Sequence, residues 1–124
     1  MMYQTTWAND QQTTVYMALS GDWHADHIVD AHRSVHTMLS EVGHPVSIVV
    51  HIQQPRAINT ELMTQLRAFI GMDHPNRDKI VIVAPTVYMK GVGEIIRRLF
   101  GGEKPTYLIY ADDLNHAETA LMSA

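Results

Sequence analysis

Two kinds of apolar pattern alternate along this chain. β-Branched and aliphatic residues dominate short segments at residues 13–21, 46–52, 79–84 and 106–110, and a weaker segment of this kind covers residues 2–7. A nearly continuous apolar run such as VSIVVHI at 46–52 is typical of a strand that is covered on both faces. The pattern predicts five strands, the first pairing with the second across the polar turn ANDQQ.

Between these segments, apolar residues recur at helical spacing. At about 100° per residue, each of the first three helical segments places its large apolar side chains on one face. Predicted inward positions are Ile28, Ala31, Val35, Met38, Leu39 and Val42 in the first helix, Leu62, Met63, Leu66, Phe69 and Ile70 in the second, and Tyr88, Val92, Ile95, Ile96 and Leu99 in the third. A short fourth helix follows, capped by Asp112 or Asp113.

Glycines punctuate the third predicted helix. Gly101 and Gly102 supply its C-terminal stop. Gly91 and Gly93 lie inside it and provide only two glycines of a dinucleotide fingerprint, which should open a helix after a strand. We therefore interpret Gly91 and Gly93 as close-packing positions.

The resulting order is ββαβαβαβα. Alternating strands and helices of this length predict an α/β fold, with a mostly parallel sheet, flanking helices and an antiparallel N-terminal strand. A chain of 124 residues is long enough for one core and too short for two. Residues 1–124 are therefore expected to form a single domain.

Composition narrows the classes of function. The absence of cysteine excludes disulfides, thiol catalysis and cysteine-ligated metal centres. A net charge of −4 argues against nucleic acid as the main partner. No apolar run approaches the ~20 residues of a membrane helix, and the polar N-terminal segment does not have the pattern of a secretory signal. We expect a cytoplasmic protein without membrane insertion.

Four short segments resemble the STAS domain, the fold shared by sulfate transporters and anti-sigma-factor antagonists. They are GDW at the first helix, EVGHPVSIVV and HPNRDKIVIV at two parallel strands, and RRLFGG at the end of the third helix. The chain is most similar to the short stand-alone bacterial proteins of the SpoIIAA-like kind. The resemblance implies a STAS-like fold and a non-enzymatic regulatory or protein-interaction domain that works through contacts around its second helix.

The resemblance also implies a position for regulation. In phosphorylated members, an acidic residue ends the strand before the second helix, and a serine begins that helix. The acid would fall near His51 or Gln53 and the serine near Asn59 or Thr60, and neither is present. Thr60 is the remaining candidate phospho-acceptor, where a helix N-terminus would stabilise the added charge. The simpler interpretation is that Thr60 adjoins a helix cap at Asn59.

The carboxyl ends of parallel strands form the usual ligand crevice of such sheets. Arg56 is the candidate anion ligand there, although a loop arginine is commonly just solvated. This crevice supports the alternative function, binding of a nucleotide, an anion or a lipid. The candidate binding residues are Gln53, Gln54, Arg56, Asn59, Thr60, Thr86 and Tyr88, with Asp112 following the last strand.

Eight histidines could titrate near pH 6 and could in principle hold a metal. His32 and His36 are one turn apart, a spacing that lets two histidines bind one ion. His24 and His27 repeat the idea, but one straight helix cannot bring all four together. The sequence offers no third ligand, so we interpret them as solvated histidines at the edge of the helix.

The remaining candidate surface is basic. Lys90, Arg97 and Arg98 form an outward row on the third helix that could meet an acidic partner or could simply be its solvated face. No set of catalytic residues emerges, and we expect no enzyme, no cofactor and no metal. The expected partner is another protein or a second copy of the chain.

Overall fold

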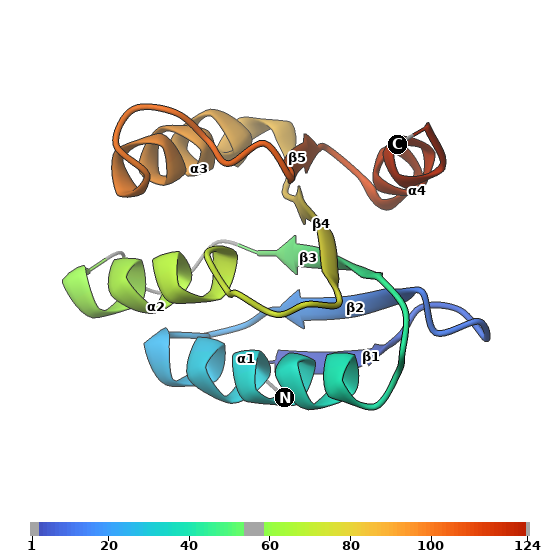
Figure 1. Cartoon of the computed structure of the whole chain (residues 1–124). Helices are drawn as coiled ribbons and strands as arrows, with labels where there is room; N and C mark the ends of the chain where they lie inside the picture. The colour runs from blue at the N-terminus through green and yellow to red at the C-terminus, as the bar shows by residue number, and fades with distance from the viewer. Residues whose placement is uncertain (1–2, 54–58, 124) are drawn as a thin grey trace.

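The computed structural model describes residues 3–53 and 59–123, and its elements follow the order predicted from the sequence (Figure 1). The strands are β1 (Tyr3–Trp7), β2 (Thr14–Leu19), β3 (Val46–Ile52), β4 (Arg77–Val83) and β5 (Leu108–Ala111). The helices are α1 (Ala25–Ser40), α2 (Thr60–Ile70), α3 (Thr86–Leu99) and α4 (Leu114–Ser123). The last strand begins at Leu108 and not at residue 106, because a turn closed by the Leu108 amide on the Pro105 carbonyl precedes it.

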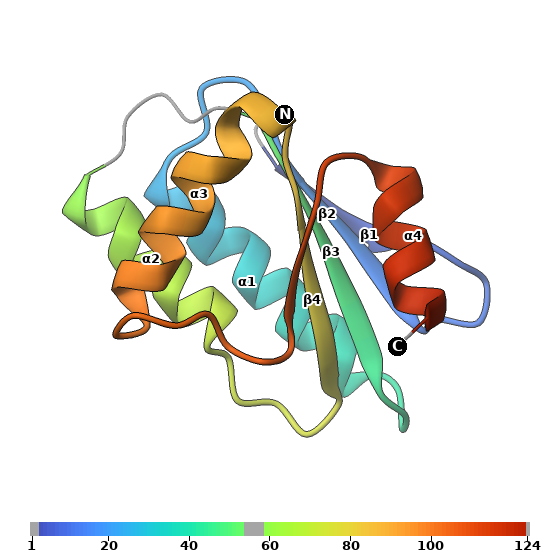
Figure 2. The same ribbon diagram turned by 90° about the horizontal axis from the view of Figure 1, so that it is seen from above.

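The five strands form one sheet in the order β1-β2-β3-β4-β5. β1 is antiparallel to β2, and the other neighbours are parallel, which confirms the predicted α/β fold with an antiparallel N-terminal strand. Figure 2 shows α1, α2 and α3 on one face of the sheet and α4 on the other. α4 lies against β3, β4 and β5. Among the described residues, no helix is long and apolar enough to cross a membrane.

Two cores of unequal size hold these layers together. The larger lies between the sheet and α1–α3 and contains Met17, Ile48, Ile82, Leu39 and Phe69, all of them fully buried. The smaller lies under α4 and consists of Val49, Val81, Val83, Ala111 and Ala117. Each large aliphatic or aromatic side chain contributes roughly 1.5–3 kcal/mol when removed from water. Because β3 and β4 are covered on both faces, their sequences read as continuous apolar runs.

Two details of the third helix were predicted wrongly. Tyr88 does not face inward and is 37% exposed, because the first three residues of α3 are all exposed and the helix meets the core only beyond them. Gly91 is not a close-packing position, since a Cβ there would meet nothing within 4 Å. At Gly93 a Cβ would touch the ring of Tyr110 at 3.7 Å, an ordinary van der Waals distance.

Helix termini follow the predicted chemistry. The Asn59 side chain accepts the Leu62 amide at 2.8 Å and caps α2. At α4 the cap is Asp113, whose carboxylate accepts the His116 amide at 2.7 Å. α3 ends where predicted, because Gly101 takes a φ of +74° that favours glycine.

The C-terminal end of α1 depends on an asparagine from another loop. The Asn76 side-chain amide donates to the carbonyls of Leu39 at 3.0 Å and Val42 at 2.8 Å. The backbone carbonyl of Asn76 accepts the backbone amide of Val46 at 2.7 Å, at the start of β3. One residue therefore supplies donors for a carbonyl in the last turn of α1 and for the Val42 carbonyl just beyond the helix, and it ties two loops together.

We expect Asn76→Ala to lower the free energy of unfolding by about 1–3 kcal/mol, because two carbonyls lose their donor. Urea denaturation followed by circular dichroism measures this change. Asp73→Ala, an exposed substitution in the same loop, is the matched control and should change the stability by less than about 0.5 kcal/mol. Equal stability of the two variants would contradict this role of Asn76.

Candidate functional site

The described candidate binding residues do lie at the carboxyl ends of the parallel strands. Gln53 follows β3, Asn59 and Thr60 begin α2, and Thr86 and Tyr88 belong to the first turn of α3. The candidates Gln54 and Arg56 lie outside the described residues.

The polar groups at this edge do not converge on a common point. The Asn59 side chain is occupied as the α2 cap, and the Gln53 carbonyl accepts the indole N–H of Trp23 at 2.7 Å. Within residues 3–53 and 59–123, no hydrogen bond joins the segments at Gln53, Asn59 and Thr86 to one another. What the described residues place here is therefore a set of separate polar groups and not a ligand cage.

An apolar slot of about 60 Å³ lies at the same end of the molecule, between α2 and α3. Its lining is Trp23, Ile52, Leu62, Met63, Leu66, Val92 and Ile95, and we call it the α2–α3 slot. Trp23 is only 2% exposed and is fixed by its bond to the Gln53 carbonyl. None of the lining side chains can take up or release a proton, so the slot can bury an apolar group but cannot perform acid–base chemistry.

A second hollow, which we call the outer hollow, shares Met63 with the slot and extends from α2 to Leu99 of α3. It includes Thr60, Met63, Thr64 and Arg67 and has a volume of about 470 Å³. Arg67 is engaged within the chain, because its Nε donates to the Leu99 carbonyl at 3.1 Å. Thr60 and Thr64 are exposed. Substitution of Thr64 thus tests the surface, whereas substitution of Arg67 also disturbs the join between α2 and α3.

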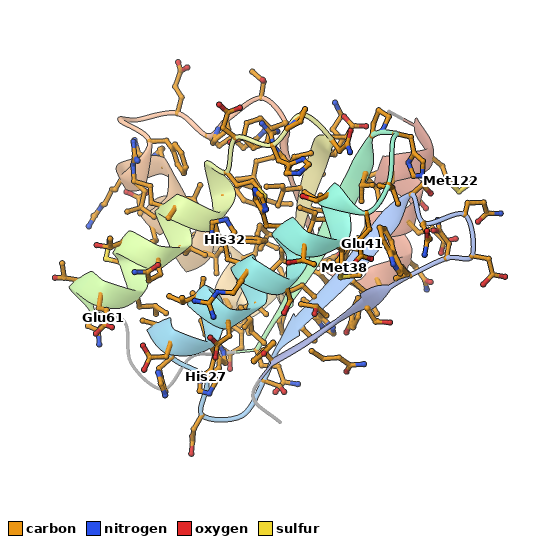
Figure 3. The ribbon with its side chains drawn as sticks, turned by 60° about the horizontal axis from the view of Figure 1, so that its bottom comes forward. His27, His32, Met38, Glu41, Glu61 and Met122 are labelled. Carbon is orange, nitrogen blue, oxygen red and sulfur yellow. The ribbon has the colours of Figure 1, made fainter. Side chains whose placement is uncertain are left out.

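His24 and His27 have a structural role at the start of α1. His24 is the N-cap of α1, and its side chain accepts the Asp26 amide at 3.4 Å. The His24 amide in turn donates to Nδ1 of His27 at 2.9 Å, which closes a capping box. Figure 3 shows His27 at the beginning of α1. The three-residue spacing of this pair therefore reflects helix capping.

The other pair on α1, His32 and His36, has a neighbour that the sequence analysis missed. The His32 ring lies edge-on against Phe69 of α2, with ring centroids 5.4 Å apart. The His36 ring meets the ring of His74, from the loop before β4, at 4.8 Å. His74 is fixed on both sides, since Nδ1 accepts the Asn76 amide at 3.0 Å and Nε2 lies 3.1 Å from the Ser40 hydroxyl. Only the folded chain brings His74 to α1.

These histidines do not assemble a metal site. Among the described residues, Asp112, Asp113 and His116 are the one group of three potential ligands whose ligand atoms lie within 4.8 Å of one another, and all three are exposed. Helix capping by Asp113 and the ion pairs of His116 with both carboxylates explain their proximity. We therefore assign no metal to this group.

The basic row on α3 is partly neutralised. Arg97 pairs with Glu94 at 2.6 Å, and Arg98 approaches the same carboxylate at 3.4 Å. The hydrogen bond from Arg97 holds the pKa of Glu94 below its usual value. Of the three predicted basic residues, two are thus paired within the helix, which weakens the case for an acidic partner on this face.

His32, His36 and His74, which we call the histidine cluster, couple the stability of the fold to pH. Burial, followed by repulsion from His36, lowers the pKa of His32 and of His74 below the usual 6.5. The folded state therefore binds fewer protons than the unfolded state as the pH falls through this range. By linkage, the stability that these groups confer is complete above pH 6.5 and is lost progressively below it.

We expect the free energy of unfolding to decrease as the pH falls below 6.5, and we expect the double variant His32→Gln, His74→Asn to flatten this decrease. The asparagine can still accept the Asn76 amide in place of the ring nitrogen. Urea denaturation at a series of pH values measures the slope. His44→Gln is the control for removal of a histidine outside the cluster. An unchanged slope in the double variant would exclude His32 and His74 as its source.

Comparisons with other proteins provide no relative for this chain. No protein-family model, no curated protein and no solved structure matches it. The α/β fold rests on the geometry described above, and the candidate function must rest on the same geometry.

Proposed function

We propose that this chain is a non-enzymatic regulatory domain of STAS type that binds another protein through the α2–α3 slot. The observation that carries the proposal is the lining of the slot, which is apolar throughout and lies at the end of the molecule where this fold presents its second helix. Protein interfaces are commonly anchored by one apolar side chain that enters such a pocket, surrounded by contacts of little energetic weight.

The surface around the slot supports this interpretation. Val92 and Ile95 line the slot, and Tyr88 precedes Val92 by one helical turn, so it continues the same stripe of α3 outward. Tyr88 and its neighbour Val87, which is 79% exposed, are two of the few large apolar side chains on the surface. Tyrosine is enriched at interfaces because it combines a large apolar ring with a hydrogen-bonding hydroxyl.

The size of the slot argues against a nucleotide, an anion or a lipid as its occupant. Pockets for small ligands commonly measure about 300–1,000 Å³. A slot of about 60 Å³ holds the tip of one side chain and not a nucleotide or an acyl chain. Its apolar lining also offers nothing to bind an anion.

We propose that the partner is a cytoplasmic protein or a second copy of this chain. Thr60 lies at the outer hollow together with Met63, which also lines the slot. A phosphate on Thr60 would therefore bring charge to the edge of an apolar contact, and we propose Thr60 as the position at which modification would regulate binding.

We expect Met63→Asp to weaken partner binding by at least tenfold, because it places a charge in an apolar anchor pocket. Met122→Asp is the matched control, since Met122 is 80% exposed on α4, on the opposite face of the sheet. Affinity capture with quantitative mass spectrometry should identify a protein that wild type and Met122→Asp retain and Met63→Asp loses. Its dissociation constant is then measured with purified components.

Sedimentation equilibrium separates the two kinds of partner. If the partner is a second copy, wild type and Met122→Asp dimerise, whereas Met63→Asp is monomeric. Thermal unfolding must show that Met63→Asp is folded at the temperature of the assay. Equal binding by the two variants, toward an external protein and toward a second copy, would refute the slot as the interaction site.

A further inference from the structure

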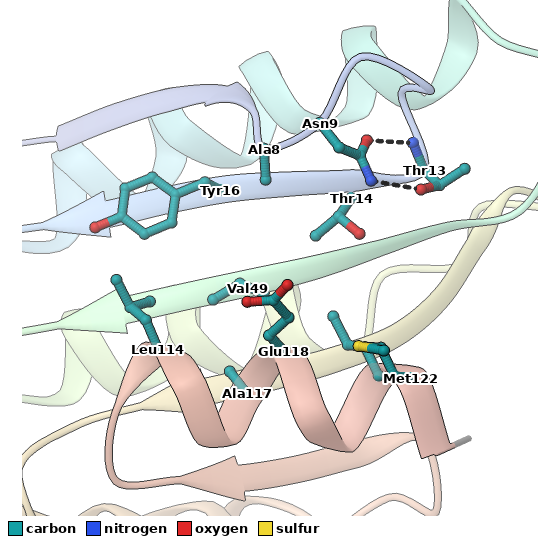
Figure 4. A pocket seen from close by; sticks show the side chains of 11 residues that line it. Ala8, Asn9, Thr13, Thr14, Tyr16, Val49, Leu114, Ala117, Glu118 and Met122 are labelled. Atoms are coloured by element: carbon teal, nitrogen blue, oxygen red, sulfur yellow. Dashed lines mark hydrogen bonds between the residues drawn. The ribbon is translucent and has the colours of Figure 1, made fainter.

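A separate groove lies on the face of the sheet opposite the α2–α3 slot. α4 covers β3, β4 and β5 there but leaves β2 open, and a groove of about 480 Å³ runs between α4 and β2 (Figure 4). Tyr16 and Val49 form its floor, and Leu114, Ala117 and Leu121 of α4 form one wall. Its volume falls within the range that is typical of pockets for small organic ligands.

One exposed residue of α4 places a charge beside the groove. Leu114, Ala117 and Leu121 follow one another at the spacing of an apolar helix face, and Glu118 belongs to the same face by position. Figure 4 shows its side chain on the side of α4 that borders the groove, between Leu114 and Met122. Among the described ion pairs, none includes Glu118. An exposed carboxylate therefore lies in an otherwise apolar wall and is available to a ligand.

Most other polar groups of the groove are already satisfied by the protein. The side-chain Nδ2 of Asn9 donates to the Thr13 hydroxyl at 2.7 Å, and the Asn9 side-chain oxygen accepts the backbone amide of Thr13 at 3.0 Å. At the other end, the Tyr16 hydroxyl and Nδ1 of His51 are hydrogen-bonded at 2.8 Å. Among the described lining residues, Glu118 is the one that carries a full charge.

We propose that this groove binds an elongated small molecule with an apolar body and one protonated amine. The amine would pair with the Glu118 carboxylate, and the body would lie along Tyr16, Val49 and Leu121. The charge and the apolar walls together select this class, because an anion would be repelled by Glu118 and a fully polar molecule would gain nothing from the walls. The site is separate from the α2–α3 slot and lies on the other face of the sheet.

Octylamine, 1-octanol and octanoate form a probe series in which only the head group changes. We expect octylammonium to bind most tightly, the alcohol more weakly and the carboxylate most weakly when the full chain is titrated near pH 7. Two-dimensional NMR of the ¹⁵N-labelled protein measures the affinity and locates the site. The amide signals of Tyr16, Ala117 and Leu121 should shift, and those of Leu62 and Leu66 in the α2–α3 slot should not.

Three variants test the contribution of each feature. Glu118→Gln should weaken octylammonium by about two- to fivefold, the range expected for the loss of one exposed ion pair, and should leave octanol unchanged. Glu61→Gln, which neutralises an exposed acid on α2, is the matched control and should change neither. Ala8→Trp, at an exposed wall position, should reduce the binding of both by filling the groove.

The proposal is overturned if no probe produces a saturable shift of the groove signals, or if Glu118→Gln and Glu61→Gln bind octylammonium equally. Shifts confined to Leu62 and Leu66 would also overturn it, because they would place the probe in the slot. None of these results bears on protein binding at the slot, so the two proposals stand or fall separately.

Discussion

The order in which the parallel strands are added to the sheet determines where the helices lie and where hollows remain on the surface. From β2 to β5 each strand adds beside its predecessor and on the same side of it. Parallel crossovers are almost always right-handed, so the three connecting helices must lie on one face. Of the described helices, α4 alone covers the other face. Three helices pack side by side on one face, and the slot lies between α2 and α3. On the other face, α4 leaves part of the sheet uncovered, and this part is the groove.

Side chains that suggest chemistry in the sequence are largely used to hold the chain together. His24 and His27 close a capping box, Asn59 and Asp113 cap their helices, and Arg67 binds a carbonyl at the end of α3. Buried polar groups and helix ends need such partners, because an unpaired donor or acceptor away from water is costly. Consistent with this, the described buried side-chain nitrogen and oxygen atoms all have hydrogen-bond partners.

The sequence is sufficient for the elements and for most of the core, because periodicity follows directly from which face of an element is buried. β3 was predicted residue for residue, since seven consecutive residues are covered on both faces or nearly so. Tyr88 was placed wrongly because periodicity shows the face of a helix but not where the helix leaves the core. The contact of His74 with His36 and the groove beneath Glu118 depend on how distant segments dock, and local spacing contains no information on docking.

α4 is attached to the sheet by little buried apolar area. Ala117 is its one fully buried side chain among those described, and the residues beneath it are valines and an alanine. A helix held by so little apolar area is expected to detach in local fluctuations well below the free energy of global unfolding. Each detachment would uncover the aliphatic surface of β3 and β4, which is the kind of patch through which proteins aggregate. A molecule bound across the groove would close this opening and would protect the least covered face of the sheet.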